Sequence, residues 1–168
     1  MERLFVAFSV DKLKQLESRI QECMGRLSPE QIWWRPSDEN NSVGNLVLHL
    51  TGNVRQWILA SVGGASDTRQ RDTEFASRGD FDVGEMSRAL SETVEQASHI
   101  IQDLSAERLT DRVTVQGYDK SVLEVVYHVV EHFAQHTGQI IYITKALRKE
   151  DLGFYRHLQS ASHTAKTP

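Results

Sequence analysis

Seven histidines are the residues of this 168-residue chain best suited to chemistry, and three of them follow one another at intervals of four. His128, His132 and His136 would lie along one side of a helix. Each step of four residues advances about 6 Å along a helix and about 40° around it. Neighbouring histidines of the series can therefore share a metal ion. The outer two, about 12 Å apart, are too distant for an ion with bonds near ~2.1 Å. One pair from this helix plus a ligand from another helix is the feasible arrangement.

The apolar pattern of the same segment indicates which pair this is. Positions at steps of three and four, as on the face that a helix turns to a bundle core, are Val125, Val129, His132, His136, Ile140, Ile143 and Leu147. His128 falls about 40° from His132, on the side of Glu124 and Glu131. We therefore expect His132 and His136 to be buried, but not His128. A metal that binds the deprotonated nitrogens would satisfy two buried imidazoles.

The third ligand is expected from the segment 42–58, which contains His49. A polar strip that suits a ligand-lined cavity borders the apolar face of this segment, and it consists of Ser42, Asn45, His49, Asn53 and Gln56. Asn45, Asn53 and Gln139 are candidates to orient the ligand imidazoles, because metal-bound histidines normally donate their other N–H to a partner. Ordinary surface polarity is the alternative for these three residues. His99, His157 and His163 have no comparable neighbours.

The elements that must position these residues are helical. Apolar periodicity predicts long helices over 2–27, 42–62, 83–104 and 122–147. Ser28, Pro29 and Gln31 predict a capping box and a short extra helix. We expect residues 65–79 to form a charged surface connection and 113–118 a short extended loop. The prediction is an all-α four-helix bundle with long loops, one domain over residues 1–168. Residues 151–168 would be a short tail with a flexible end, docked through Leu152, Phe154 and Tyr155.

Composition excludes several classes of function. The net charge is −4 and no run of Lys or Arg exceeds two, which argues against a nucleic-acid partner. No apolar stretch approaches the roughly 20 residues that span a bilayer, and the first residues lack a signal-peptide pattern. Cys23 is the only cysteine, so no internal disulfide can form. It lies in an apolar helical pattern and is expected to be inert packing and not a nucleophile. These features predict a cytoplasmic protein.

The chain resembles the DinB/YfiT-like superfamily of metal-binding four-helix bundles, as an uncharacterised branch of it. The resemblance rests on His49, on the stretch HFAQHTGQI over residues 132–140, and on segments 41–58 and 151–158. It implies an up-down-down-up bundle, often a homodimer, in which His49, His132 and His136 hold one divalent ion. His128 is a further histidine that the motif does not require; it is a candidate to support the ligands or to line the pocket, and a different ligand pair stays open. Zinc or nickel is the first choice of metal, with iron or manganese as further options.

Characterised members of this superfamily include transferases that use low-molecular-weight thiols such as bacillithiol, and a mycothiol-dependent isomerase. The resemblance therefore implies a metal-dependent enzyme, in first place a transferase that joins a small thiol to an electrophilic small molecule. A metal-activated hydrolase is the second hypothesis, weakened because we identify no buried carboxylate as general base; Glu131 points about 100° away from His132. A non-catalytic metal- or ligand-binding stress-response protein and a bundle without metal remain alternatives. Solvated positions are expected for Arg69 and Arg71, with contact to an anionic substrate as the alternative. Core packing is expected for Trp33, Trp34 and Trp57, with pocket lining as the alternative.

Overall fold

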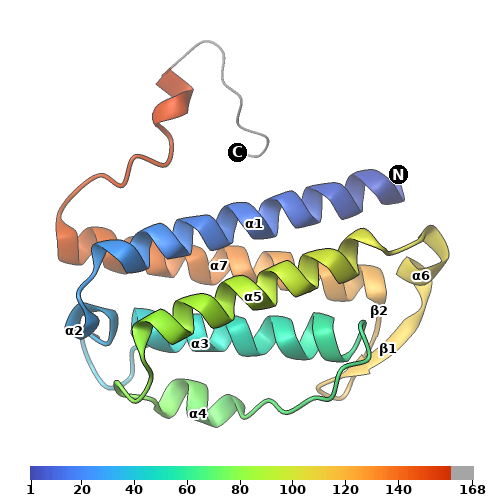
Figure 1. Ribbon diagram of the computed structural model, residues 1–168, viewed down its shortest axis with the longest axis horizontal. Helices are drawn as coiled ribbons and strands as arrows, with labels where there is room; N and C mark the ends of the chain where they lie inside the picture. Colours follow the sequence, from blue (N-terminus) through green and yellow to red (C-terminus); the bar gives the residue numbers. More distant parts are fainter. Residues whose placement is uncertain (160–168) are drawn as a thin grey trace.

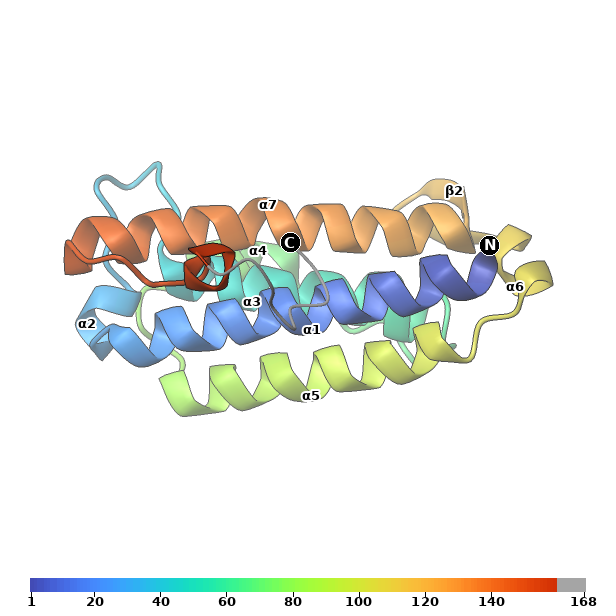
Figure 2. The same ribbon diagram turned by 90° about the horizontal axis from the view of Figure 1, so that it is seen from above.

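Four long helices frame the computed structural model, which describes residues 1–159 (Figure 1). They are α1 (Glu2–Arg26), α3 (Val43–Val54), α5 (Val83–Gln102) and α7 (Val122–Arg148). α1 and α7 run in one direction and α3 and α5 in the other, which is the up-down-down-up order that the resemblance implied (Figures 1 and 2). α1 packs against α5 and α7, and α3 packs against the same two helices. α3 and α7 are therefore neighbours across which a shared site can form.

Side-chain caps fix where these helices begin. Ser42 and Ser121 start α3 and α7 with capping boxes, in which Asn45 and Glu124 return the bond to the cap residue. The capping box predicted at Ser28 is also present, and it starts the short helix α2 (Pro29–Ile32). At the other end of α3 the chain continues into the π-helical turn η1 (Arg55–Ala60). Such turns are rare in proteins overall, but those that occur are often found near functional sites.

The core line of α7 differs from the predicted one. Its buried residues are Val122, Val125, Val126, Val129, Phe133, Thr137, Ile140 and Thr144. Phe133 is fully buried and takes the central place that the sequence analysis gave to His132 and His136. Burial of such an aromatic ring stabilises a fold by about 1.5–3 kcal/mol, which no neutral imidazole matches. His128, His132 and His136 are all half-buried at the edge of this line, so the expectation that only His128 lies outside the core is wrong.

The connections hold more structure than the sequence analysis predicted. The charged segment 65–79 contains α4 (Arg71–Ala76), which packs along α3 and lies below it in Figure 1. α6 (Ala106–Thr110) follows α5. The expected extended loop is an antiparallel hairpin of β1 (Arg112–Val115) and β2 (Tyr118–Ser121). Its two turn residues, Gln116 and Gly117, have φ values of 51° and 80°, as a tight hairpin turn requires.

The tail docks on the bundle only in part. Leu152 is buried and Phe154 packs against the core, as predicted, whereas Tyr155 is 57% exposed. The short 3₁₀ helix η2 (Arg156–Gln159) ends the described chain. His163 and the expected flexible end lie among residues 160–168, outside the described residues. Between residues 1 and 159, no helix is both long enough and apolar enough for a bilayer crossing.

Candidate metal centre

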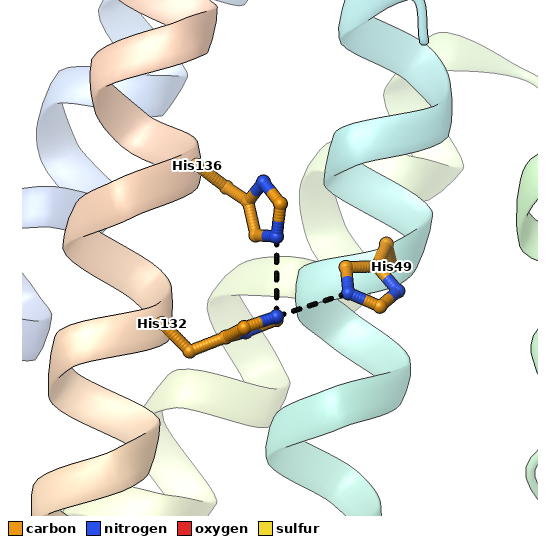
Figure 3. A group of neighbouring side chains, drawn as sticks. All are labelled: His49, His132 and His136. Carbon is orange, nitrogen blue, oxygen red and sulfur yellow. Dashed lines mark hydrogen bonds between the residues drawn. The ribbon is translucent and has the colours of Figure 1, made fainter. Parts of the chain in front are cut away.

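The structure brings together the three histidines that the sequence analysis selected (Figure 3). His49 comes from α3, while His132 and His136 lie one helical turn apart on α7. The Nε2 atom of His132 lies 3.1 Å from Nε2 of His49 and 3.1 Å from Nε2 of His136. The three ligand atoms that the group offers all lie within 4.8 Å of one another. One nitrogen of each ring therefore faces a common point between α3 and α7.

Hydrogen bonds alone do not satisfy this arrangement. A neutral ring nitrogen has either one hydrogen or one lone pair, so Nε2 of His132 can pair well with only one of its two neighbours. A cation at the common point would accept a lone pair from all three rings. Ligand nitrogens at about 2.1 Å from such an ion stand about 3.0 to 3.4 Å apart in octahedral or tetrahedral geometry. The two separations of 3.1 Å, from Nε2 of His132 to Nε2 of His49 and of His136, fit this range, so the residues present suit a divalent metal.

The outer ring nitrogens have partners that support the same tautomer. Nδ1 of His49 lies 2.9 Å from Oε2 of Glu74, and Nδ1 of His136 lies 2.6 Å from Oε1 of Gln139. Nη2 of Arg69, which can only donate, also lies 3.1 Å from Nδ1 of His49, but the contact of this nitrogen with Glu74 is shorter. With the hydrogens on Nδ1, accepted by Glu74 and Gln139, the Nε2 lone pairs of His49 and His136 are free for a metal. Nδ1 of His132 is buried and has no hydrogen-bond partner within residues 1–159.

Burial keeps the three histidines of α7 neutral by lowering their pKa values. It lowers the pKa of His132 to about 3, with further lowering from the nearby His136, His49, His128 and Arg69. The pKa values of His128 and His136 are also below the ordinary range, in first place because of burial. At neutral pH these rings therefore carry free lone pairs and can act as metal ligands.

Glu74 is a buried carboxylate that the sequence analysis missed. It lies on α4, and its side chain is 9% exposed. Its oxygens lie 2.7 Å from Nε and 2.8 Å from Nη2 of Arg69. Burial raises the pKa of Glu74, but the hydrogen bonds from Arg69 and His49 outweigh this effect and hold it below its ordinary value. Glu74 is therefore an ionised group directly behind a candidate metal ligand.

The solvated position expected for Arg69 from the sequence is wrong. Its side chain is only 4% exposed, because it is paired with Glu74. The segment 65–79 folds back over α3 at Gly52. A Cβ atom on Gly52 would lie 2.1 Å from Oε1 of Glu74, so glycine makes this close approach possible. The charged residues of the segment 65–79 indicated a surface loop. The one sequence signal for close packing was Gly52, a glycine inside a predicted helix, because it leaves room for another segment against α3.

Within residues 1–159, neither Asn45 nor Asn53 forms a hydrogen bond with an imidazole, whereas Gln139 does. The amide nitrogen of Asn45 donates to the backbone oxygens of Glu74 (2.9 Å) and Ser77 (3.0 Å), and its oxygen accepts from Ser42. Asn45 thus fixes the end of α4 against α3 and acts on His49 only through the position of Glu74. Asn53 is buried and lines the cavity described next.

A cavity of about 520 Å³ opens beside the histidines, between η1, the hairpin and the first turns of α7. This volume is in the range of small-molecule sites. The ring of His128 packs on that of Trp57, with centroids 4.1 Å apart, and forms one wall. Trp57 is thus both buried and pocket-lining, whereas Trp34 is 42% exposed and lies elsewhere. The lining residues are His49, Asn53, Trp57, Arg69, Arg71, Gln116, Tyr118, Lys120, Leu123, Glu124, Tyr127, His128 and His132.

Cys23 lies apart from this cavity. It is fully buried in α1, and burial raises the pKa of its thiol. Both properties agree with the expected role as packing.

Comparison with known proteins supports the fold. A family described as "Protein of unknown function (DUF1572)" matches residues 1–158. A conserved protein from Enterococcus faecalis is 14% identical, with a TM-score of 0.71 over 86% of this chain and 97% of that one. The DinB-like protein YjoA from Bacillus subtilis is 15% identical, with a TM-score of 0.66 over 88% and 96%. A DinB-like protein from Bacillus cereus is 12% identical, with a TM-score of 0.64 over 80% and 87%. No curated protein matches the chain significantly. The helix bundle is therefore DinB-like, as the resemblance predicted.

Proposed function

The chain belongs to the DUF1572 family, and we propose that it is a divalent-metal-dependent enzyme that transfers a low-molecular-weight thiol to an electrophilic small molecule. The observation that carries the proposal is the convergence of three Nε2 atoms, from α3 and α7, beside an open cavity. Three protein ligands leave coordination positions open, which is typical of catalytic metal sites and not of structural ones. Zinc or nickel is the proposed metal, with iron or manganese as further options.

A divalent ion bound there would lower the pKa of a thiol or water and so supply a nucleophile at neutral pH. The residues of the chain prepare this site. Glu74 and Gln139 accept hydrogens from Nδ1 of His49 and His136, and Phe75 of α4 packs its ring against His49. His128 lines the cavity as a neutral imidazole and can accept the proton that the thiol loses. The thiolate sulfur then forms a bond to the electrophilic carbon, and the leaving group departs with the electron pair of the broken bond.

Metal-activated hydrolysis is the second candidate. The buried carboxylate that this reaction lacked in the sequence analysis exists in Glu74. Both of its oxygens, however, are held by Arg69 and His49, and Glu74 does not line the cavity. This arrangement favours an orienting role over that of a general base for water. A non-catalytic metal- or ligand-binding stress-response protein is the further alternative. For the proposed enzyme, we also propose that the chain forms a homodimer and is located in the cytoplasm.

An assay with small thiols and a model electrophile tests the proposal. The protein, loaded separately with zinc, nickel, iron and manganese, is incubated with bacillithiol, glutathione or cysteine and 1-chloro-2,4-dinitrobenzene. Formation of the thioether above the uncatalysed rate, and its loss in the His49→Ala/His136→Ala variant, would support thiol transfer. Hydrolysis of model esters by the loaded protein, with no thioether formed from any thiol, would favour the hydrolase instead. Metal binding with neither activity would favour the non-catalytic alternative.

A further inference from the structure

The charges and aromatic rings of the cavity indicate which molecules it accepts. Arg69, Arg71 and Lys120 line it, against a single carboxylate, that of Glu124. The whole chain carries a net charge of −4, so this excess of positive charge is local. A divalent ion at the histidines would add to it. A cavity of this sign attracts anions and disfavours cations.

Arg71 is the cation that remains available for a ligand. Arg69 is occupied by Glu74 and Gln56, and Lys120 pairs with Glu124 at 3.2 Å. Arg71 is exposed and has no ion pair with any carboxylate of residues 1–159. Its guanidinium group lies over the ring of Phe75, 4.9 Å from the ring centroid. The Phe75 ring in turn packs on His49 at 4.6 Å. A stacked and unpaired guanidinium is thereby held at the mouth of the cavity, close to the candidate metal ligands.

Glu124 does not offset this positive charge in a way that repels an anion. Its carboxylate accepts hydrogen bonds from the backbone N–H and the hydroxyl of Ser121, and it also pairs with Lys120 and Arg112. These contacts belong to the N-terminal cap of α7, and they direct the carboxylate toward its own helix end. The cation and the carboxylate of the Lys120–Glu124 pair balance each other, which leaves Arg71 as the net charge at the rim.

The remaining wall is apolar and flat. Tyr118, Leu123 and Tyr127 line the cavity with exposed fractions of 58%, 42% and 61%, so their side chains are accessible to a ligand. The His128 ring, packed on Trp57 with the ring planes tilted by 40°, continues this surface toward the histidines. Aromatic rings of this kind favour contact with another planar group.

We propose that the cavity binds a small molecule with a flat, apolar body and a carboxylate or phosphate group, the anion paired with Arg71 and the body against Tyr118, Tyr127 and His128. The inference rests on the proposed function, because it names the class of molecule on which the metal site would act. The anion at Arg71 and the rings across the cavity would orient the flat body, so that its reactive atom faces His132.

Isothermal titration calorimetry with the full-length protein, after incubation with zinc, tests this inference. The probes are 2-naphthoate, 2-naphthyl phosphate, the neutral 2-naphthylmethanol, and acetate and inorganic phosphate as anions without a flat body. We expect one of the two naphthyl anions, or both, to bind in a 1:1 complex, with the alcohol and the small anions weaker by about tenfold or more. A preference between the naphthyl anions would identify the anionic group.

Two pairs of variants separate the contacts. Arg71→Met should weaken binding of the naphthyl anion by about tenfold, whereas Arg88→Met, an exposed arginine on α5, should leave it unchanged. Tyr127→Ala should weaken binding of the same anion, and Tyr142→Ala, an exposed tyrosine of α7 outside the cavity, should not.

Three results would overturn the inference: equal affinity for the alcohol, no effect of Arg71→Met, or no binding of either naphthyl anion. An anion held only by the metal would give the second result. The metal content of the same samples is measured separately. Selectivity that depends on Arg71 in a protein without metal would therefore refute the proposed enzyme and leave this inference standing. A metal-loaded protein that binds the naphthyl anions and the alcohol equally would refute this inference and leave the proposed enzyme standing.

Discussion

Replacement of Glu74 separates its two roles, the stabilisation of Arg69 and the orientation of His49. Glu74→Ala leaves the guanidinium of Arg69 buried without its ion pair, because the Arg69 side chain is only 4% exposed. Removal of one partner from a buried ion pair typically costs about 3–5 kcal/mol in the free energy of unfolding. The same change removes the acceptor 2.9 Å from Nδ1 of His49. Loss of such a partner typically weakens metal binding by about 10–100-fold.

The two effects can be measured independently. Denaturant unfolding of the metal-free protein reports stability, and competition with a chromophoric chelator reports zinc affinity. The double variant Arg69→Met/Glu74→Ala should recover much of the lost stability, since no buried charge is left unpaired, while zinc affinity stays low. Glu92→Ala, an exposed carboxylate on α5, is the matched control and should change neither quantity. Wild-type zinc affinity in Glu74→Ala would refute the orienting role, and wild-type stability would refute the buried ion pair.

Three further predictions use the same two measurements. Gly52→Ala should lower the free energy of unfolding by about 1–3 kcal/mol, because the new Cβ would lie 2.1 Å from Oε1 of Glu74. Gly138→Ala on α7 is the control: a Cβ there meets no neighbouring side chain within 4 Å, so the free energy of unfolding should stay the same or rise by up to about 1 kcal/mol. Gln139→Ala should weaken zinc binding by about tenfold and leave the free energy of unfolding within about 0.5 kcal/mol, since Gln139 is exposed. A depressed pKa of His132, to about 3, means that between that value and about 6.5 the unfolded chain binds more protons than the folded one. The stability of metal-free protein should therefore fall as the pH is lowered through this window. His132→Gln should flatten the dependence, and an unchanged curve in that variant would contradict the assignment.

Spacing in the sequence was sufficient to find the three histidines, because the i, i+4 pair and a partner on another apolar helix are local patterns. Spacing was insufficient to predict how deeply these histidines are buried. The steps between Val129 and Ile140 allow either His132 and His136 or Phe133 and Thr137 to face the core. The structure resolves this ambiguity by burying Phe133, and the polar rings move to the border with α3.

Glu74 and Arg69 could not be located from the sequence for a different reason. The segment 65–79 carries charges of both signs and little apolar periodicity, which is typical of a surface loop. Its position depends on tertiary contacts, above all on the bonds from Asn45 to the backbone of α4 and on the space beside Gly52. The cavity likewise depends on the hairpin and on the π-helical turn η1. The latter arises inside a segment whose pattern predicts an uninterrupted α-helix.

Metal content is the most direct test of the central claim that His49, His132 and His136 form a metal site. Elemental analysis of the purified, untagged protein is compared with the His49→Ala/His136→Ala variant and with His99→Ala, an exposed histidine on α5, as control. We expect about one equivalent of a divalent metal in the parent and the control, and almost none in the double variant. If the parent and the double variant are both empty, even after incubation with zinc, nickel, iron and manganese, the three histidines do not form a metal site and the proposed enzyme loses its basis.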